Sequence, residues 1–408
     1  MTTDPLITAA ARALAAGDPV AALNRIALRN DAPALALRGI AMAQLGDLVR
    51  AKALMRRAGA AFGPKAAVAR ARCVVAEGEI ALASRDLAWP MKRLDAAREM
   101  LETHGDRANV AHAHTIEIRR LLLIGRLDEA ERRLVDLELA CLPSASRAAC
   151  ELVAAGIAMR RLQTQAARTA LERAGQAARQ AGIGALSAEI ESAWRLLHAP
   201  AARLIARGEE RLLVLEEVQA LLAGPALVVD ACRYGVSGAG IQVSLARRPV
   251  LFALARGLAQ AWPGDVPRET LMAQAFGVKL TDESHRARLR VEMGRLRATL
   301  RPLAGVRATP RGFTLIPRHA DEVVVLARVV EEPYGAVLAL LADGEAWSSS
   351  ALALALDISQ RSVQRALETL AAAGKAQSFG RGRARRWMAP PMPGFATVLL
   401  LTALPSED

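Results

Sequence analysis

One short turn signature recurs along the first half of the chain, and it limits what that half can form. Its copies are about 38–40 residues apart, and each stands between two stretches rich in Ala and Leu. Because Ala and Leu lose little conformational freedom in a helix, each stretch predicts one helix. A repeat of this length is typical of helical hairpins that stack into a solenoid. The four copies are Leu45-Gly46-Asp47-Leu48, Ser84-Arg85-Asp86-Leu87, Ile124-Gly125-Arg126-Leu127 and Arg161-Leu162-Gln163-Thr164.

The repeats predict a helical domain over residues 1–223, with no strand pattern inside it. Small residues such as Ala51 and Ala130 follow the turns at helical spacing and allow close packing of paired helices. The segments 43–51 and 123–130 resemble tetratricopeptide repeats, although that family's usual period is about 34 residues. The resemblance implies a concave surface for a peptide or small-molecule effector. The alternative is a spacer or dimerisation module that binds no ligand.

The positive charge of the chain is concentrated in one block. The whole chain has 54 Lys and Arg against 41 Asp and Glu, a formal net charge of +13. Residues 233–318 hold 15 of these basic and 5 of these acidic groups, so this block carries +10 of the excess. A basic block depleted in acids is typical of a polyanion partner, usually nucleic acid.

The same block is expected to form strands, then three helices, then a β-hairpin. The last helix begins at Asp282, a predicted N-cap, and the hairpin turns at Pro310-Arg311-Gly312. In the order of their predicted elements and in their sequence motifs, residues 224–320 resemble the output domain of two-component response regulators. This resemblance implies a winged-helix DNA-binding domain. The motifs that carry the resemblance are Arg268-Glu269-x-Leu271, Phe276-Gly277, residues 291–300 and Thr309-x-Arg311-Gly312-Phe313.

The third helix of this block is the predicted recognition helix. Four apolar residues fall at i, i+4, i+7 and i+11 and would face the core: Leu289, Met293, Leu296 and Leu300. The arginines lie off that stripe, where they can bond guanine edges or phosphates. The alternative is a solvated arginine face that packs on its neighbours. The candidate DNA-binding residues of this domain are Arg286, Arg288, Arg290, Arg295, Arg297 and, in the hairpin turn, Arg311.

A second helix-turn-helix is predicted in residues 335–390, after a linker at 321–334 and before a C-terminal tail at 391–408. The turn Asp357-Ile358-Ser359 resembles that of winged-helix regulators of the multiple-antibiotic-resistance and replication-initiator types. Ile358 is expected to plug between the two helices, and Ser359 to cap the second. Its candidate DNA-binding residues are Gln360, Arg361, Gln364 and Arg365 on the helix and Arg381, Arg383 and Arg385 in a basic hairpin. The alternative is a module for dimerisation or protein contacts.

The sequence contains none of the phosphate-binding, zinc-protease, calcium-loop or serine-nucleophile motifs of common enzymes. We therefore expect no enzyme activity, no metal and no cofactor. The spread of the four cysteines favours free thiols in a reducing cytoplasm, with a redox pair of Cys141 and Cys150 as the alternative. No apolar run approaches the roughly 18–20 residues that span a bilayer, so no membrane contact is expected.

The sequence thus predicts a mainly α protein, in which an N-terminal α-solenoid precedes two small winged-helix domains with short β-strands. The predicted function is a cytoplasmic transcriptional regulator that binds double-stranded DNA as a homodimer. RNA polymerase and an effector of the helical repeat are further expected partners. The two alternatives are a protein-interaction scaffold and a plasmid-type replication initiator.

Overall fold

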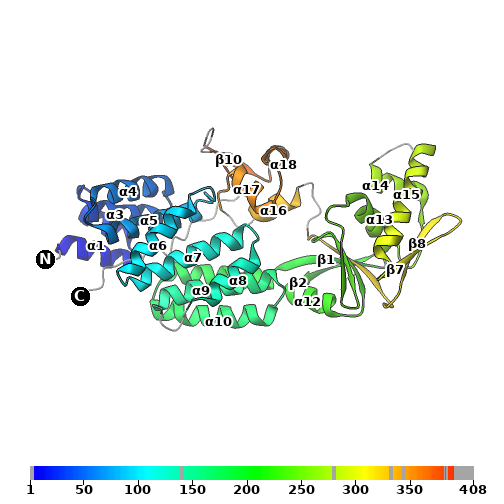
Figure 1. Ribbon diagram of the computed structural model, residues 1–408, viewed down its shortest axis with the longest axis horizontal. Helices are drawn as coiled ribbons and strands as arrows, with labels where there is room; N and C mark the ends of the chain where they lie inside the picture. The colour runs from blue at the N-terminus through cyan, green and yellow to red at the C-terminus, as the bar shows by residue number, and fades with distance from the viewer. Residues whose placement is uncertain are drawn as a thin grey trace. The chain divides into compact units, whose positions relative to one another are not determined.

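The computed structural model of the chain describes residues 4–137, 142–277, 282–329, 334–341, 345–380, 382 and 385–389. Within these ranges the protein is mainly helical, with some small sheets (Figure 1). No helix in the same ranges is both long and apolar enough to cross a membrane. The chain divides into two compact units: Met1–Arg161, Gln165–Arg195 and Pro333–Asp408 form the first, and Leu162–Thr164 and Leu196–Glu332 form the second.

The first unit consists largely of helices that follow one another along the chain. They are α1 (Pro5–Ala15), α2 (Pro19–Ile26), α3 (Ala32–Gln44), α4 (Leu48–Ala61), α5 (Ala67–Ala83), α6 (Met91–Thr103), α7 (Arg107–Leu123), α8 (Leu127–Val135), α9 (Ser144–Arg160), α10 (Thr164–Ala181) and α11 (Gly184–His198). Each of the four predicted turns lies between two of these helices, as expected. Aspartates cap several of them; Asp47, for example, accepts a hydrogen bond from the backbone N–H of Arg50 at the start of α4.

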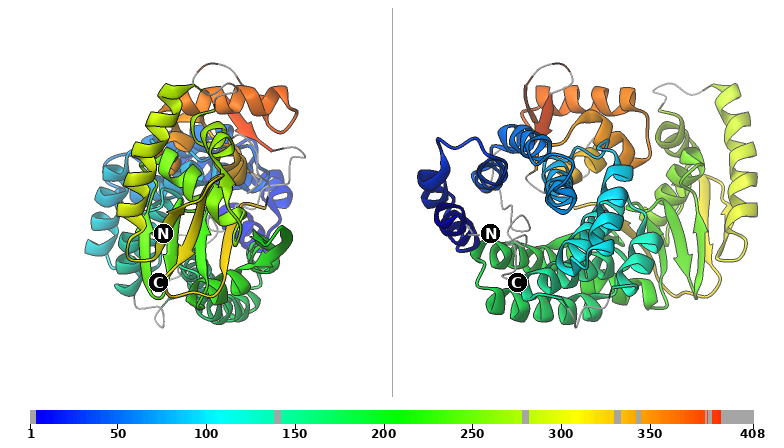
Figure 2. Two further views of the ribbon diagram at one scale, coloured as in Figure 1. Left: turned by 90° about the vertical axis from the view of Figure 1, so that its right-hand side faces the viewer. Right: turned by 60° about the vertical axis from the view of Figure 1, so that its left-hand side comes forward.

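The second unit is built on a six-stranded sheet with the strand order β2-β1-β9-β3-β4-β5. Its strands are β1 (Pro200–Ala206), β2 (Glu209–Val214), β3 (Leu227–Asp230), β4 (Gly235–Gly238), β5 (Ile241–Ser244) and β9 (Val323–Ala327), and they lie side by side in Figure 2. Strand β9 runs parallel to β3, with Leu227 opposite Val323, and antiparallel to β1.

Both faces of this sheet are covered at its central strand β9. Strand β9 is buried along its whole length, and its alternate residues enter two different cores. Val323 and Val325 join the cluster that includes residues of α13 (Pro249–Gln260). Val324 joins the cluster that includes residues of α12 (Leu215–Ala223). An apolar run without polar alternation is what a strand buried on both faces requires.

Two expectations about this region are wrong. Residues 200–214 form the hairpin β1–β2 rather than helix, with positive φ angles at both turn residues, Arg207 and Gly208. The start of β1, Pro200-Ala201-Ala202, gives no strand signal of its own. Pairing of Pro200 and Ala202 with β2, and of Arg203–Ile205 with β9, overrides the helical preference of Ala. The expected linker at 321–334 contains β9, a central strand of the sheet.

A smaller sheet follows in the same unit, with the strand order β6-β8-β7. Its strands are β6 (Val266–Pro267), β7 (Ala304–Ala308) and β8 (Gly312–Pro317), and α14 (Arg268–Phe276) and α15 (Glu283–Leu300) lie between β6 and β7 in the chain. The elements thus come in the predicted order of strands, three helices and a hairpin.

The C-terminal elements belong to the first unit. They are α16 (Gly335–Leu341), α17 (Ser349–Leu356), α18 (Gln360–Ala372), β10 (Gln377–Phe379) and β11 (Arg386–Met388). Trp347, which precedes α17, and Leu367 of α18 share one hydrophobic cluster with Leu82, Leu94 and Ile116 of α5, α6 and α7. This module is therefore packed on α5, α6 and α7.

Candidate nucleic-acid interface

Helix α15 has the cap and the core stripe that its sequence predicts. The Asp282 side chain accepts a hydrogen bond from the backbone N–H of His285 at 2.9 Å, and this bond lowers the pKa of the Asp282 carboxyl. The four residues of the predicted stripe are all buried: Leu289, Met293, Leu296 and Leu300. Because this stripe is fixed against the core, the helical period sets the direction in which every other side chain of α15 points.

The arginines of α15 are exposed, and most of their partners are on the same helix. Glu283 pairs with both Arg286 at 3.3 Å and Arg290 at 3.2 Å, and Glu292 pairs with Arg295 at 2.8 Å. The helix has five arginines and two glutamates, so it keeps a net charge of +3. The two pairs of Glu283 are exposed on both sides, whereas the Glu292 side chain is only 13% exposed. Exposed ion pairs contribute little to stability, so a phosphate can replace Glu283 at small cost.

Two of the predicted DNA-binding arginines are occupied by contacts within the second unit. The guanidinium carbon of Arg288 lies 4.4 Å from the centre of the Phe276 ring at the end of α14. Arg297 donates a hydrogen bond from Nε to the backbone oxygen of Val306 at 2.8 Å and lies over the Phe313 ring. Arg297 therefore fastens α15 to the β7–β8 hairpin, a structural role that the sequence analysis did not give it.

The turn of this hairpin is held from the side of α14. Arg268 donates hydrogen bonds to the backbone oxygens of Thr309 and Pro310, at 3.0 and 2.9 Å. The Thr309 hydroxyl donates to Asp265 at 2.7 Å. Arg311 is exposed at this fixed turn, and Arg307 is exposed on β7. Arg307 was not among the predicted DNA-binding residues. Its position close to the basic turn at Arg311 is the sequence signal that could have identified it.

The second helix-turn-helix has the predicted caps and core. Ser359 accepts a hydrogen bond from the backbone N–H of Ser362 at 3.1 Å, and Val363 and Leu367 are buried on α18. On the opposite side Arg361, Gln364 and Arg365 are exposed, as expected. Gln360 is also exposed, and its amide nitrogen donates to the Ser349 hydroxyl at 3.0 Å.

The expected position of Ile358 is wrong. Its side chain is 45% exposed and does not plug between α17 and α18. Asp357 in this turn has a φ of 52°, in the left-handed region, and ends α17. The space between the helices is filled instead by residues of the helices themselves, including Leu352 and Leu367.

The basic hairpin near the C-terminus is described only in part. Arg381, Arg383 and the tail at 391–408 lie outside the described residues. The guanidinium carbon of Arg385 lies 4.3 Å from the centre of the Trp387 ring, and Arg385 donates a hydrogen bond to Ser378.

Of the two cysteines considered as a redox pair, only Cys150 lies in the described part of the chain. Cys150 is buried and lies 3.4 Å from the Thr115 hydroxyl, and burial raises the pKa of its thiol. Its suggested partner, Cys141, is one of the residues that are not described. Groups of three or more His, Cys, Asp or Glu able to hold a metal are absent from the described ranges.

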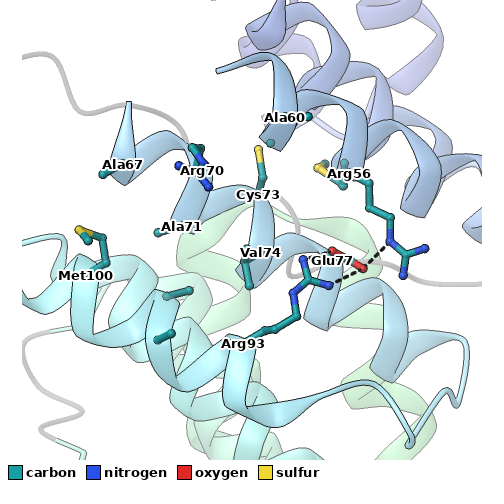
Figure 3. Close-up of a pocket in the computed structure, with 14 residues that line it drawn as sticks. Arg56, Ala60, Ala67, Arg70, Ala71, Cys73, Val74, Glu77, Arg93 and Met100 are labelled. Carbon is teal, nitrogen blue, oxygen red and sulfur yellow. Dashed lines mark hydrogen bonds and ion pairs between the residues drawn. The ribbon is translucent and has the colours of Figure 1, made fainter. Parts of the chain in front are cut away.

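A cavity of about 590 Å³ lies among α4, α5 and α6 of the first unit, and the sequence analysis did not identify it (Figure 3). Its lining includes Arg56, Arg70, Arg93 and a buried carboxylate, Glu77. The sequence feature that could have pointed to it is Glu77, which stands within an apolar stretch of α5. A carboxylate buried there needs polar or charged partners.

Comparison with known proteins yields no relative: no family model, curated protein or solved structure matches the chain.

Proposed function

We propose that this protein is a transcriptional regulator that binds double-stranded DNA through α15 and the β7–β8 hairpin. The observation that carries the proposal is the division of α15 into two faces. Its Leu and Met stripe is fully buried, while Arg286, Arg290 and Arg295 are exposed and pair with Glu283 and Glu292 of the same helix. A helix of this kind can lie in the major groove and exchange those glutamates for phosphates and base edges.

The hairpin turn supports the same proposal. Arg268 and Asp265 hold the turn, and the exposed Arg311 and Arg307 extend from it. A basic hairpin beside a recognition helix suits the backbone or the minor groove next to the groove that the helix enters. In this proposal both parts belong to one winged-helix domain.

The C-terminal module is proposed as a second DNA-binding head. Arg361, Gln364 and Arg365 share the exposed side of α18, and Gln and Arg are the residues that read adenine and guanine edges. The helical repeat would hold an effector or partner, and a homodimer would read two half-sites. The proposal includes no enzyme activity and a cytoplasmic location, with RNA polymerase as a further partner.

A salt series with random duplex DNA tests the central claim. By fluorescence anisotropy we expect binding at low salt that weakens steeply as salt rises, because phosphate contacts release counterions. Absence of binding at low salt would contradict the proposal and favour the alternative of a protein-interaction scaffold.

Replacing three arginines of α15 tests where the DNA binds. We expect R286A/R288A/R290A to weaken binding by about 100-fold or more, because each removed contact to a base or phosphate costs affinity. A matched control, R12A/R57A/R132A, removes the same charge from exposed positions of the helical repeat and should leave affinity nearly unchanged. Equal losses in both variants would show a general charge effect and not a recognition helix. Mapping of genomic sites then separates promoters from a replication origin, the second alternative.

A further inference from the structure

The cavity of the helical repeat is built from small residues on three helices. Ala60 of α4, Ala71 of α5 and Ala96 of α6 are among its lining residues, and their short side chains leave the space open. Its volume of about 590 Å³ is within the range of sites for small organic molecules. Met55, Val74 and other apolar side chains form much of the remaining wall.

One end of the cavity holds a fixed pair of arginines. Glu77 is 1% exposed, and it accepts hydrogen bonds from Arg56 at 2.8 Å and from Arg93 at 2.9 Å (Figure 3). The indole N–H of Trp89 donates to the same carboxylate at 3.2 Å. Because a guanidinium has five N–H donors, both arginines keep donors that Glu77 does not use. Their side chains remain about half exposed, at 57% and 44%.

A third arginine, Arg70, lines the cavity nearer the N-terminal end of α5. Arg70 lies two turns before Glu77, and Cys73 lies between them (Figure 3). The Arg70 side chain is exposed and makes no hydrogen bond or ion pair with the described residues. Three arginines and one glutamate line the cavity, which leaves a net charge of +2. Seven residues of helix separate its two cationic ends by roughly 10 Å.

We propose that this cavity binds a linear organic dianion whose two acidic groups are separated by an apolar spacer. One acidic group binds the free donors of Arg56 and Arg93, and the other binds Arg70. The spacer lies along the apolar wall between them. This site specifies the effector in the proposed function, but direct ligand binding can be measured whether or not the protein binds DNA.

A series of straight-chain dicarboxylates tests the proposal by calorimetry on the full-length protein. We expect affinity to rise from succinate to suberate, because only the longer acid reaches both cationic ends. The monomethyl ester of suberate should bind about tenfold more weakly than the diacid, since it lacks one charge-assisted contact. Absence of binding, or affinity that does not depend on chain length, would overturn the proposal. So would binding of a polyglutamate peptide alone, which would make this a peptide site.

Two variants identify the cavity as the location of binding. R70Q should weaken suberate about tenfold and bring the affinities of diacid and monoester close together, whereas R57Q, on α4 but outside the lining, should change neither. A96F adds no charge but fills part of the cavity at an exposed helix position, and it should also weaken suberate. Circular dichroism confirms that each variant is folded. If R70Q and A96F both bind like the unmodified protein, the dianion site lies elsewhere and the proposal is wrong. DNA affinity, measured separately, tests the proposed function independently.

Discussion

The guanidinium carbon of Arg85 lies 5.3 Å from the centre of the Trp347 ring. Arg85 belongs to the second recurring turn, between α5 and α6, and Trp347 precedes α17 of the C-terminal module. Trp347 is fully buried, and its backbone forms a bridge to Trp387 with hydrogen bonds of 2.7 and 2.8 Å. Segments more than 250 residues apart in the chain thus share one hydrophobic core.

Trp347→Ala is expected to destabilise α5–α7 and the C-terminal module together, by about 3–5 kcal/mol, because a large buried side chain is removed from their common core. Hydrogen exchange should then speed up in α5 and α6 as well as in α17 and α18. An effect confined to residues 345–389 would mean that the module folds as an independent domain. Tyr234→Ala is the control, since that ring is 41% exposed and lies in the second unit.

Arg297 and Arg290 are expected to respond differently to replacement by Ala. Arg297→Ala should lower the free energy of unfolding by about 1 kcal/mol, because the hydrogen bond to Val306 and the contact with Phe313 are lost. Arg290→Ala should leave stability within about 0.5 kcal/mol but weaken DNA binding, since its pair with Glu283 is exposed. Urea unfolding and anisotropy on both variants check this. The same stability loss in both would refute the assigned roles.

Gly312 is expected to be intolerant of any side chain. A Cβ atom there would lie 1.7 Å from the backbone oxygen of Val266 on the facing strand β6. Gly312→Ala should therefore destabilise the second unit by about 2–3 kcal/mol and displace the hairpin turn. Gly294→Ala on α15 is the matched control, because nothing lies within 4 Å of its added Cβ. That variant should be more stable by about 0.5–1 kcal/mol in thermal unfolding. A stable Gly312→Ala protein would disprove the close approach.

Glu77 is expected to make stability depend on pH in the acid range. Burial alone would raise its pKa, but hydrogen bonds from Arg56, Arg93 and Trp89 outweigh burial and hold the pKa below the ordinary value of 4.5. A carboxyl whose pKa is lowered by folding stabilises the protein above its unfolded pKa, and that contribution is lost as the pH falls through the folded pKa.

Urea unfolding at a series of pH values below about 5 tests this dependence. The unmodified protein should lose stability as the pH falls, and Glu77→Gln should show a shallower loss over the same range. Parallel curves for the two proteins would show that Glu77 does not contribute to acid unfolding.

Local sequence signals determined much of the secondary structure. The four recurring turns, the cap at Asp282 and the buried stripe that includes Leu289 and Met293 lie where the sequence placed them. Each depends on interactions between residues a few positions apart, such as a capping hydrogen bond or the helical period. The exposure of the arginines of α15 follows from the same stripe.

Tertiary structure decided what depends on distant parts of the chain. Strand β1 lies inside the sheet because β9, more than 100 residues later, pairs with its residues Arg203–Ile205. Arg297 faces the hairpin and Glu77 gathers two arginines because the fold brings other elements to them. The packing of Trp347 on the helical repeat is decided in the same way. Local preferences amount to fractions of a kcal/mol per residue, whereas burial of one large side chain amounts to several, so long-range packing prevails where the two disagree.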